Sequence, residues 1–127
     1  MDPKANAINW FEICVNDMDR AKKFYETVLS IKMEVMDMMG MKMAGFPIDP
    51  MNGKVGGALV QGSMHKPGMD GTVIYLNGNP DLASALGKVE GAGGKILMPK
   101  TQITPEIGYM AFFVDTEGNR MALHSQN

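Results

Sequence analysis

The side chains of this sequence best suited to chemistry lie near its two ends. Glu12 follows the single tryptophan, Trp10, by two positions, and His124 follows Arg120 by four. A carboxylate can take a proton from a substrate, whereas an imidazole or a guanidinium can orient an anion. Such groups act together only where the fold brings both ends of the chain to one site.

Three roles are open for Glu12 and His124, the candidate catalytic pair. They could hold a divalent metal ion completed by water, although two protein ligands are few for a tight site. Glu12 could instead be a general base whose pKa is raised by burial beside Trp10, with Arg120 or His124 orienting a substrate for proton abstraction next to a carbonyl. In the third interpretation Glu12 forms an ion pair with Arg120 or His124, or faces solvent.

Three other residues have both a functional and a structural interpretation. Cys14 could form a nucleophile pair with His124, but nothing in the sequence signals an activated thiolate, and we interpret it as a packing residue. His65 lies in SMHKPGMDG (63–71), which has breakers and no periodicity and is expected to be a surface linker. Trp10 could either form an aromatic floor for a flat ligand or fill the core.

The elements that position these residues belong to a unit that occurs twice. The segment AGFPIDPMNGKVGGALVQ (44–61) is echoed by MAFFVDTEGNRMALHSQ (110–126), so that Phe46 corresponds to Phe112. A strand and then a helix precede each echo. The sequence therefore predicts an α+β fold, with two tandem βαβββ modules forming a curved, cup-like mixed sheet.

We expect one domain over residues 1–127, with a first module at about 6–62, the linker at 63–71 and a second module at about 72–127. In the first module, Asp17 is suited to cap a helix, and apolar residues follow helical spacing after it. Strand and turn patterns give the remaining elements. The first module is expected to have strands at 8–15, 31–38, 41–47 and 54–61, a helix at 17–30 and a turn at 49–53.

The second module is expected to repeat this order. Asn79, Pro80 and Asp81 should open its helix, with proline at the first helical position, and the glycines of 91–94 should end it. Its strands are expected at 72–77, 95–103, 107–115 and 119–126, with a turn at 115–119.

The alternation of apolar and polar residues decides which side chains face the inside of the cup. Met121 and Leu123 are apolar and should face the helices, as should Phe11, Ile13 and Val15 of the first strand. The concave face should then carry these residues: Trp10, Glu12, Cys14, Val73, Tyr75, Asn77, Arg120, Ala122 and His124.

The composition limits the class of protein. The chain has 127 residues, a net charge of −2 and 45% hydrophobic residues, which indicates a globular protein without the basic surface of a nucleic-acid binder. No apolar run approaches the roughly 18 residues of a membrane helix, and the first residues lack the pattern of a secretion signal. A cytoplasmic location is the simplest expectation, and a single cysteine excludes an internal disulfide.

Four segments together carry a family likeness: WFEICVNDMDRAKKFYETVL (10–29), GGALV (56–60), LASALGKVEGAGGK (82–95) and FVDTEGNR (113–120). In this order they resemble the vicinal oxygen chelate superfamily, which contains glyoxalase I, extradiol dioxygenases and bleomycin resistance proteins. The resemblance runs from about residue 8 to 125 and implies a glyoxalase/bleomycin resistance-type fold. It specifies function weakly, because this superfamily contains enzymes with unrelated reactions as well as binding proteins.

The resemblance also implies a place for a divalent metal. Enzymes of this superfamily hold the metal with His, Glu or Asp side chains from the first and fourth strands of each module. Those positions map onto Trp10, Ala58, Val73 and Ala122, none of which can bind a metal. The inherited metal site is therefore expected to be absent, and Glu12 and His124 each lie two residues beyond a mapped position.

We therefore expect a protein that binds a small apolar or aromatic molecule without a metal or other cofactor, and with no nucleic-acid or membrane partner. Its cup would be lined by Trp10, Val73, Tyr75 and methionines, six of which fall within 33–43. The expected polar anchors are Glu12, Arg120 and His124. The resemblance also implies a homodimer, since half-cups of this superfamily are commonly completed across an interface.

Two other functions stay open. One is a lyase, isomerase or dioxygenase that uses one divalent metal ion with a non-standard ligand set. The other is a protein–protein interaction module that uses the methionine-rich hairpin at 33–43 as its contact.

Overall fold

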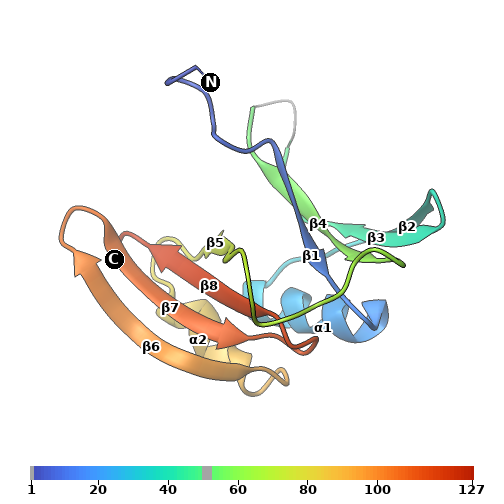
Figure 1. Ribbon diagram of the computed structural model, residues 1–127. Helices are drawn as coiled ribbons and strands as arrows, with labels where there is room; N and C mark the ends of the chain where they lie inside the picture. Colours follow the sequence, from blue (N-terminus) through green and yellow to red (C-terminus); the bar gives the residue numbers. More distant parts are fainter. Residues whose placement is uncertain (1, 50–52) are drawn as a thin grey trace.

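The computed structural model describes residues 2–49 and 53–127, which form two four-stranded sheets and two helices (Figure 1). The first module contains β1 (Trp10–Cys14), α1 (Met18–Leu29), β2 (Val35–Met38), β3 (Met41–Gly45) and β4 (Gly56–Gln61). The second contains β5 (Tyr75–Asn77), α2 (Ala83–Val89), β6 (Lys95–Thr104), β7 (Gly108–Val114) and β8 (Arg120–Ser125).

The two sheets have the same topology, which confirms the repeated unit. Their strand orders are β1-β4-β3-β2 and β5-β8-β7-β6. In each sheet the first two strands of that order are parallel and the other pairs are antiparallel. The tandem βαβββ fold predicted from the sequence is therefore confirmed, although the strands form two separate sheets.

Strand pairing defines which residues of the two modules are equivalent. Glu12 on β1 lies opposite Ala58 on β4, and Tyr75 on β5 lies opposite Ala122 on β8. Tyr75 is thus the counterpart of Glu12. The predicted alternation is also confirmed, because Ile13, Met121 and Leu123 belong to the buried core while Trp10 and Tyr75 are about half exposed.

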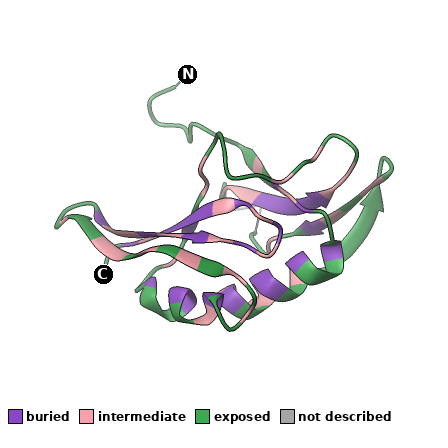
Figure 2. Cartoon of the chain, turned by 60° about the horizontal axis from the view of Figure 1, so that its bottom comes forward, coloured by how far each residue is buried: buried purple, intermediate pink, exposed green. Residues whose placement is uncertain are grey.

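Helix α1 forms where the sequence predicted a helix. The carboxylate of Asp17, its N-cap residue, accepts a hydrogen bond from the backbone N–H of Arg20 at 3.1 Å. Its apolar stripe, which includes Phe24 and Tyr25, is buried against the sheets, and Figure 2 shows the buried faces of both helices turned toward them. The helix ends at Ser30, which has a left-handed backbone conformation.

Helix α2 starts later than predicted. Asn79 forms hydrogen bonds outside the helix. Its backbone N–H donates to the Asn77 side chain at 2.9 Å, and its side-chain oxygen accepts the N–H of Gln126 at 2.8 Å. These bonds tie the segment to the ends of β5 and β8, so the helix begins only at Ala83. Its end is as predicted, because the N–H of Gly94 donates to the carbonyl of Val89 at 2.9 Å.

The predicted turn at 115–119 is present and joins the two modules. The hydroxyl of Tyr25 on α1 donates to the Asp115 carboxylate at 2.6 Å, and both groups are buried. The side chain of Asn119 donates both to Asp115 and to the carbonyl of Cys14 at the end of β1. Burial and the nearby charge of Asp115 raise the pKa of Tyr25 well above its usual value.

Glu117, in the same turn, binds the start of α1. Its carboxylate accepts the backbone N–H groups of Asn16 and Asp17 at 2.8 and 2.9 Å, and it pairs with the Arg20 guanidinium at 2.7 Å. The sequence predicted the turn but not its attachment to the other module.

Residues 50–52 of the turn predicted at 49–53 lie outside the described residues. No helix in the described part of the chain is long and apolar enough to cross a membrane.

Candidate functional site

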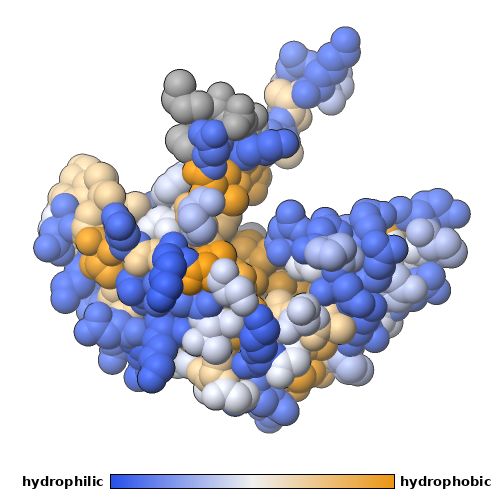
Figure 3. Space-filling view, turned by 180° about the vertical axis from the view of Figure 1, so that it is seen from behind, coloured by the Kyte–Doolittle hydropathy of each residue, from blue (hydrophilic) through white to orange (hydrophobic). Residues whose placement is uncertain are grey.

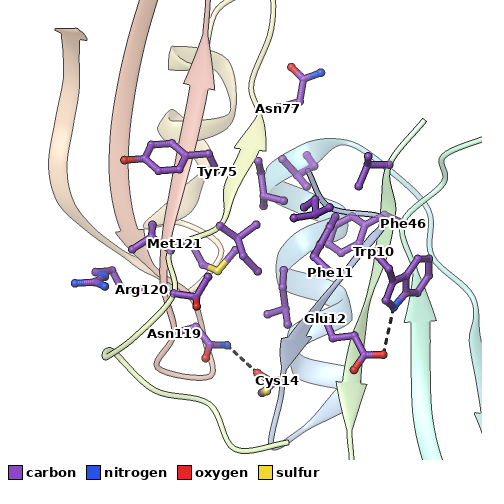
Figure 4. Close-up of a pocket in the computed structure, with 18 of the residues that line it drawn as sticks. Trp10, Phe11, Glu12, Cys14, Phe46, Tyr75, Asn77, Asn119, Arg120 and Met121 are labelled. Carbon is purple, nitrogen blue, oxygen red and sulfur yellow. Dashed lines mark hydrogen bonds between the residues drawn. The ribbon is translucent and has the colours of Figure 1, made fainter. Parts of the chain in front are cut away.

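A cavity of about 1130 Å³ lies between the facing edges of the two sheets, where β1 and β5 run (Figure 4). Its aromatic lining comes from Trp10, Phe11, Phe46 and Tyr75. Its polar lining includes Glu12, Asn77, Asn119 and Arg120. Figure 3 shows that apolar surface gathers in the hollow between the two halves of the molecule. The cavity therefore has apolar walls with a few polar groups.

The aromatic residues of this cavity come from both modules. Phe11 and Phe46 pack with ring centroids 5.3 Å apart on the side of the first module. Tyr75 packs edge-on against Phe112 at 6.0 Å in the second module. Trp10 is 51% exposed, so its indole remains available to a ligand and does not fill the core.

Glu12 is held in place by two side chains. The imidazole Nε2–H of His65 donates to Oε1 of Glu12 at 2.7 Å, and the indole N–H of Trp10 donates to Oε2 at 3.2 Å. The hydrogen bond from His65 keeps the pKa of Glu12 below its usual range, and this outweighs the opposite effect of burial. The general-base interpretation expected a raised pKa for Glu12, whereas its net pKa is lowered.

His65 is a partner of Glu12 that the sequence did not predict. It was expected at the surface of the linker, but its side chain is only 18% exposed and its Nδ1 is buried. The linker folds back on itself, because the N–H of His65 donates to the carbonyl of Gly62. The one signal available was chemical: an imidazole is a natural partner for Glu12, and the chain has two histidines.

His124, the other histidine, makes a different contact. Its ring N–H donates to the carbonyl of Ile107 at 2.7 Å, and His124 is not among the residues that line the cavity. Arg120 does line the cavity, but its guanidinium donates to the carbonyl of Gly71 at 3.0 Å. The predicted ion pair of Glu12 with Arg120 or His124 is therefore not formed, and His65 takes that place.

Several other predicted residues line the cavity, but so do Phe11 and Met121, which were predicted to face the helices. Val73 and Tyr75 line the cavity from the second module, opposite Trp10 and Glu12. Cys14 also lines it, but burial and the charge of Glu12 raise the pKa of its thiol. A thiol with a raised pKa is a poor nucleophile near neutral pH, which supports a packing role.

The positions that would hold the metal in related enzymes offer no donor atoms. Ala58 and Ala122 are fully buried, and Trp10 and Val73 complete the set. Within residues 2–49 and 53–127, no group of three or more His, Cys, Asp and Glu side chains is arranged to hold a metal ion. A homodimer would repeat the same four positions, so a partner chain would supply no missing ligand there. This donor set does not fit the metal of the related enzymes.

Comparison with solved structures identifies the same fold. A hypothetical protein from S. aureus is 23% identical, with a TM-score of 0.67 and 94% of each chain covered. Leishmania major glyoxalase I is 20% identical, with a TM-score of 0.67 over 96% of this chain and 88% of that chain. The antibiotic binding protein TnmS3 from Streptomyces sp. CB03234 is 20% identical, with a TM-score of 0.66 over 98% of both chains. At these identities the likeness shows the fold alone.

Sequence comparison goes further than the fold. No curated protein matches the chain significantly. A family model, that of the Glyoxalase/Bleomycin resistance protein/Dioxygenase superfamily, matches residues 7–123. Because this match spans nearly the whole chain and agrees with the repeated topology, the protein belongs to the Glyoxalase/Bleomycin resistance protein/Dioxygenase superfamily.

Proposed function

We propose that this protein binds a small apolar or aromatic molecule in the cavity between its two sheets, without a metal ion. One observation carries the proposal. The cavity has aromatic walls, and the positions that bind metal in related enzymes carry Trp10, Val73, Ala58 and Ala122. Mostly apolar walls with a few polar groups are typical of small-molecule sites.

The side chains suggest what such a ligand looks like. Trp10 and Tyr75 line the cavity from different modules and are each about half exposed, so each ring offers a face on which a flat ligand can stack. Arg120 supplies a positive charge on the same lining, and Asn77 a neutral polar group. His124 would have to release the carbonyl of Ile107 to reach a ligand, and both oxygens of Glu12 already accept hydrogen bonds. We therefore assign the polar anchor to Arg120, whose guanidinium has N–H groups beyond the one bonded to Gly71.

One structural neighbour supports this class of function. TnmS3 is an antibiotic binding protein, and its fold matches 98% of both chains. The same architecture therefore hosts small-molecule binding in at least one protein.

The experiment uses the single tryptophan as its reporter. Titration with 8-anilinonaphthalene-1-sulfonate, which has an aromatic body and an anionic group, should quench Trp10 emission and saturate. Tyr75→Ala should weaken binding about 10-fold, because stacked aromatic contacts in a pocket contribute about 1 kcal/mol or more. Val35→Ala, on the opposite face of the first sheet, is the matched control and should leave the affinity unchanged. Absence of saturable quenching with this probe and with a panel of neutral aromatic compounds would contradict the proposal.

One contact favours the rival function, a metal-dependent lyase, isomerase or dioxygenase. Glu12 and His65 are two metal-capable side chains within 2.7 Å of each other. Elemental analysis of untagged, dialysed protein decides between the two. A metal-to-chain ratio near one, lost in Glu12→Ala, would favour the enzyme. A ratio near zero after incubation with zinc, iron, manganese and nickel would favour the binding protein.

We also propose that the protein forms a homodimer. Met36, Met38, Met41 and Met43 pair across β2 and β3 and share the face of the sheet that carries Glu12. Met36 and Met38 are about half exposed there, and neither lines the cavity. Covering this apolar face with a second copy would remove it from water.

A further inference from the structure

We infer that His65 is a positioning residue: acting through Glu12, it fixes the indole of Trp10 and thereby sets the shape of the ligand cavity. The inference rests on the proposed binding function, and it names the residue that gives the aromatic wall its orientation. His65 does not line the cavity itself.

Three side chains form a continuous path from the linker to the cavity. His65 donates to one oxygen of the Glu12 carboxylate at 2.7 Å, and Trp10 donates to the other oxygen at 3.2 Å (Figure 4 shows the second bond). Both oxygens of Glu12 are therefore occupied. Because each bond involves a charged acceptor, each is stronger than a bond between neutral groups.

The exposed fractions of the three side chains indicate which of them holds the others in place. The exposed fraction of the side chain is 18% for His65 and 34% for Glu12, and Trp10 is 51% exposed as a residue. Packing alone does not fix a half-exposed indole, so its hydrogen bond to Glu12 matters for its orientation. The least exposed member, His65, must supply the rigidity.

The surroundings of His65 explain how it stays fixed. Its ring packs over Gly62, where a Cβ atom would lie 3.3 Å from Nδ1 of His65 and 2.9 Å from Cγ of Met41. The absence of a side chain at Gly62 therefore makes room for the imidazole beside Met41. The backbone bond from His65 to the carbonyl of Gly62 closes this short turn.

No neighbour on the sheet could replace His65. Glu12 lies opposite Ala58, whose methyl group cannot donate a hydrogen bond. The next residue on the same face of β1 is Cys14, whose thiol is a weak donor. Without His65, Glu12 would be free to change rotamer, and the indole of Trp10 would follow it or lose its partner.

The test follows the indole of Trp10 in the free protein by nuclear magnetic resonance. A single tryptophan gives one indole N–H signal, whose chemical shift and hydrogen exchange report the bond to Glu12. His65→Ala should shift this signal, speed its exchange about 10-fold and lower the fluorescence anisotropy of Trp10. His65→Gln, whose amide can still donate to Glu12, should restore the native signal. Affinity for 8-anilinonaphthalene-1-sulfonate should fall about 3- to 10-fold in His65→Ala and recover in His65→Gln.

Two further variants make the result decisive. Glu12→Ala removes both hydrogen bonds while His65 is still present, and it should reproduce the change in the indole signal. His124→Gln changes the other histidine and should leave the indole signal as in the native protein. An indole signal unchanged in folded His65→Ala, or no recovery in His65→Gln, would overturn the inference. Failure of the probe to bind the native protein would count against the proposed function, while the indole signal alone would still decide the positioning role.

Discussion

Hydrogen bonds lower the pKa of several carboxyl groups in this protein, and the largest effect is at Glu117. Burial raises the pKa of Glu117, but hydrogen bonds from Arg20 and from the backbone of Asp17 and Asn16 lower it to about 2. The folded-state pKa thus lies below the usual value of 4.5. The stabilisation from this group is complete above about pH 4.5 and is lost as the pH falls toward about 2.

Replacing Glu117 should therefore destabilise the protein in a pH-dependent way. Glu117→Gln should lower the free energy of unfolding by about 2 kcal/mol at pH 7, since it removes the charge paired with Arg20 while keeping the side-chain shape. The difference from the native protein should shrink between pH 4.5 and pH 2.5. Urea unfolding at several pH values measures it. Glu34→Gln, at an exposed glutamate, is the control, and an equal loss in both variants would contradict the argument.

The sequence allowed part of this residue-level description and not the rest. Trp10, Glu12 and Arg120 line the cavity, as alternation along the strands predicted. Phe11 and Met121, which alternation predicted to face the helices, line it as well, so strand parity alone does not select the lining. The partner of Glu12 could not be found in this way. His65 reaches Glu12 through a turn at Gly62, and no periodic pattern predicts how such a linker folds back.

At the scale of elements, two adjacent glycines at the start of β4 shape the first wall of the cavity. Gly57 lies opposite Phe11, and a Cβ atom there would come within 2.6 Å of the Phe11 ring and closer still to its carbonyl oxygen. Gly56 lies opposite Trp10, and a Cβ atom there would keep ordinary contacts of 3.6 Å or more. The close approach of β1 and β4 therefore requires glycine at 57 but not at 56.

This difference gives a prediction with a built-in control. Gly57→Ala should lower the free energy of unfolding by about 2 kcal/mol or more, because the β1 backbone must move away from the new methyl group. Gly56→Ala should change it by less than about 0.5 kcal/mol. Thermal unfolding of the two variants measures both effects. Similar stability of the two would show that β1 and β4 are not packed as described.

The elements themselves were largely predictable. Helical spacing and the Asp17 cap located α1 within a residue at each end, because the signals lie within the element. The start of α2 was placed too early. Asn79 had the right residue type for a helix start, but its bonds go to Asn77 and Gln126, which the sequence does not indicate.

For the whole molecule, two features bear on assembly: the attachment of the second module to α1 and an exposed apolar face on the first sheet. The turn at 115–119 fixes the second module to α1 of the first, which sets the width of the cavity between them. The outer strands of the first sheet, in contrast, expose methionines on the face that carries Glu12. A molecule whose halves are fixed to each other can form a stable dimer through such a face without altering its cavity.

Adjacent residues of β2 give the sharpest test of this dimer. Met36 points to the face with Glu12, whereas Val35 pairs with Ala44 on the opposite face, and both side chains are exposed. Met36→Glu should weaken dimerisation at least about 10-fold, because a charge would be buried in an apolar contact. Val35→Glu adds the same charge to the other face and should leave the dimer intact. Sedimentation velocity over a range of concentrations measures both. A native protein that stays monomeric, or equal dissociation of the two variants, would mean that the methionine face does not contact a second copy.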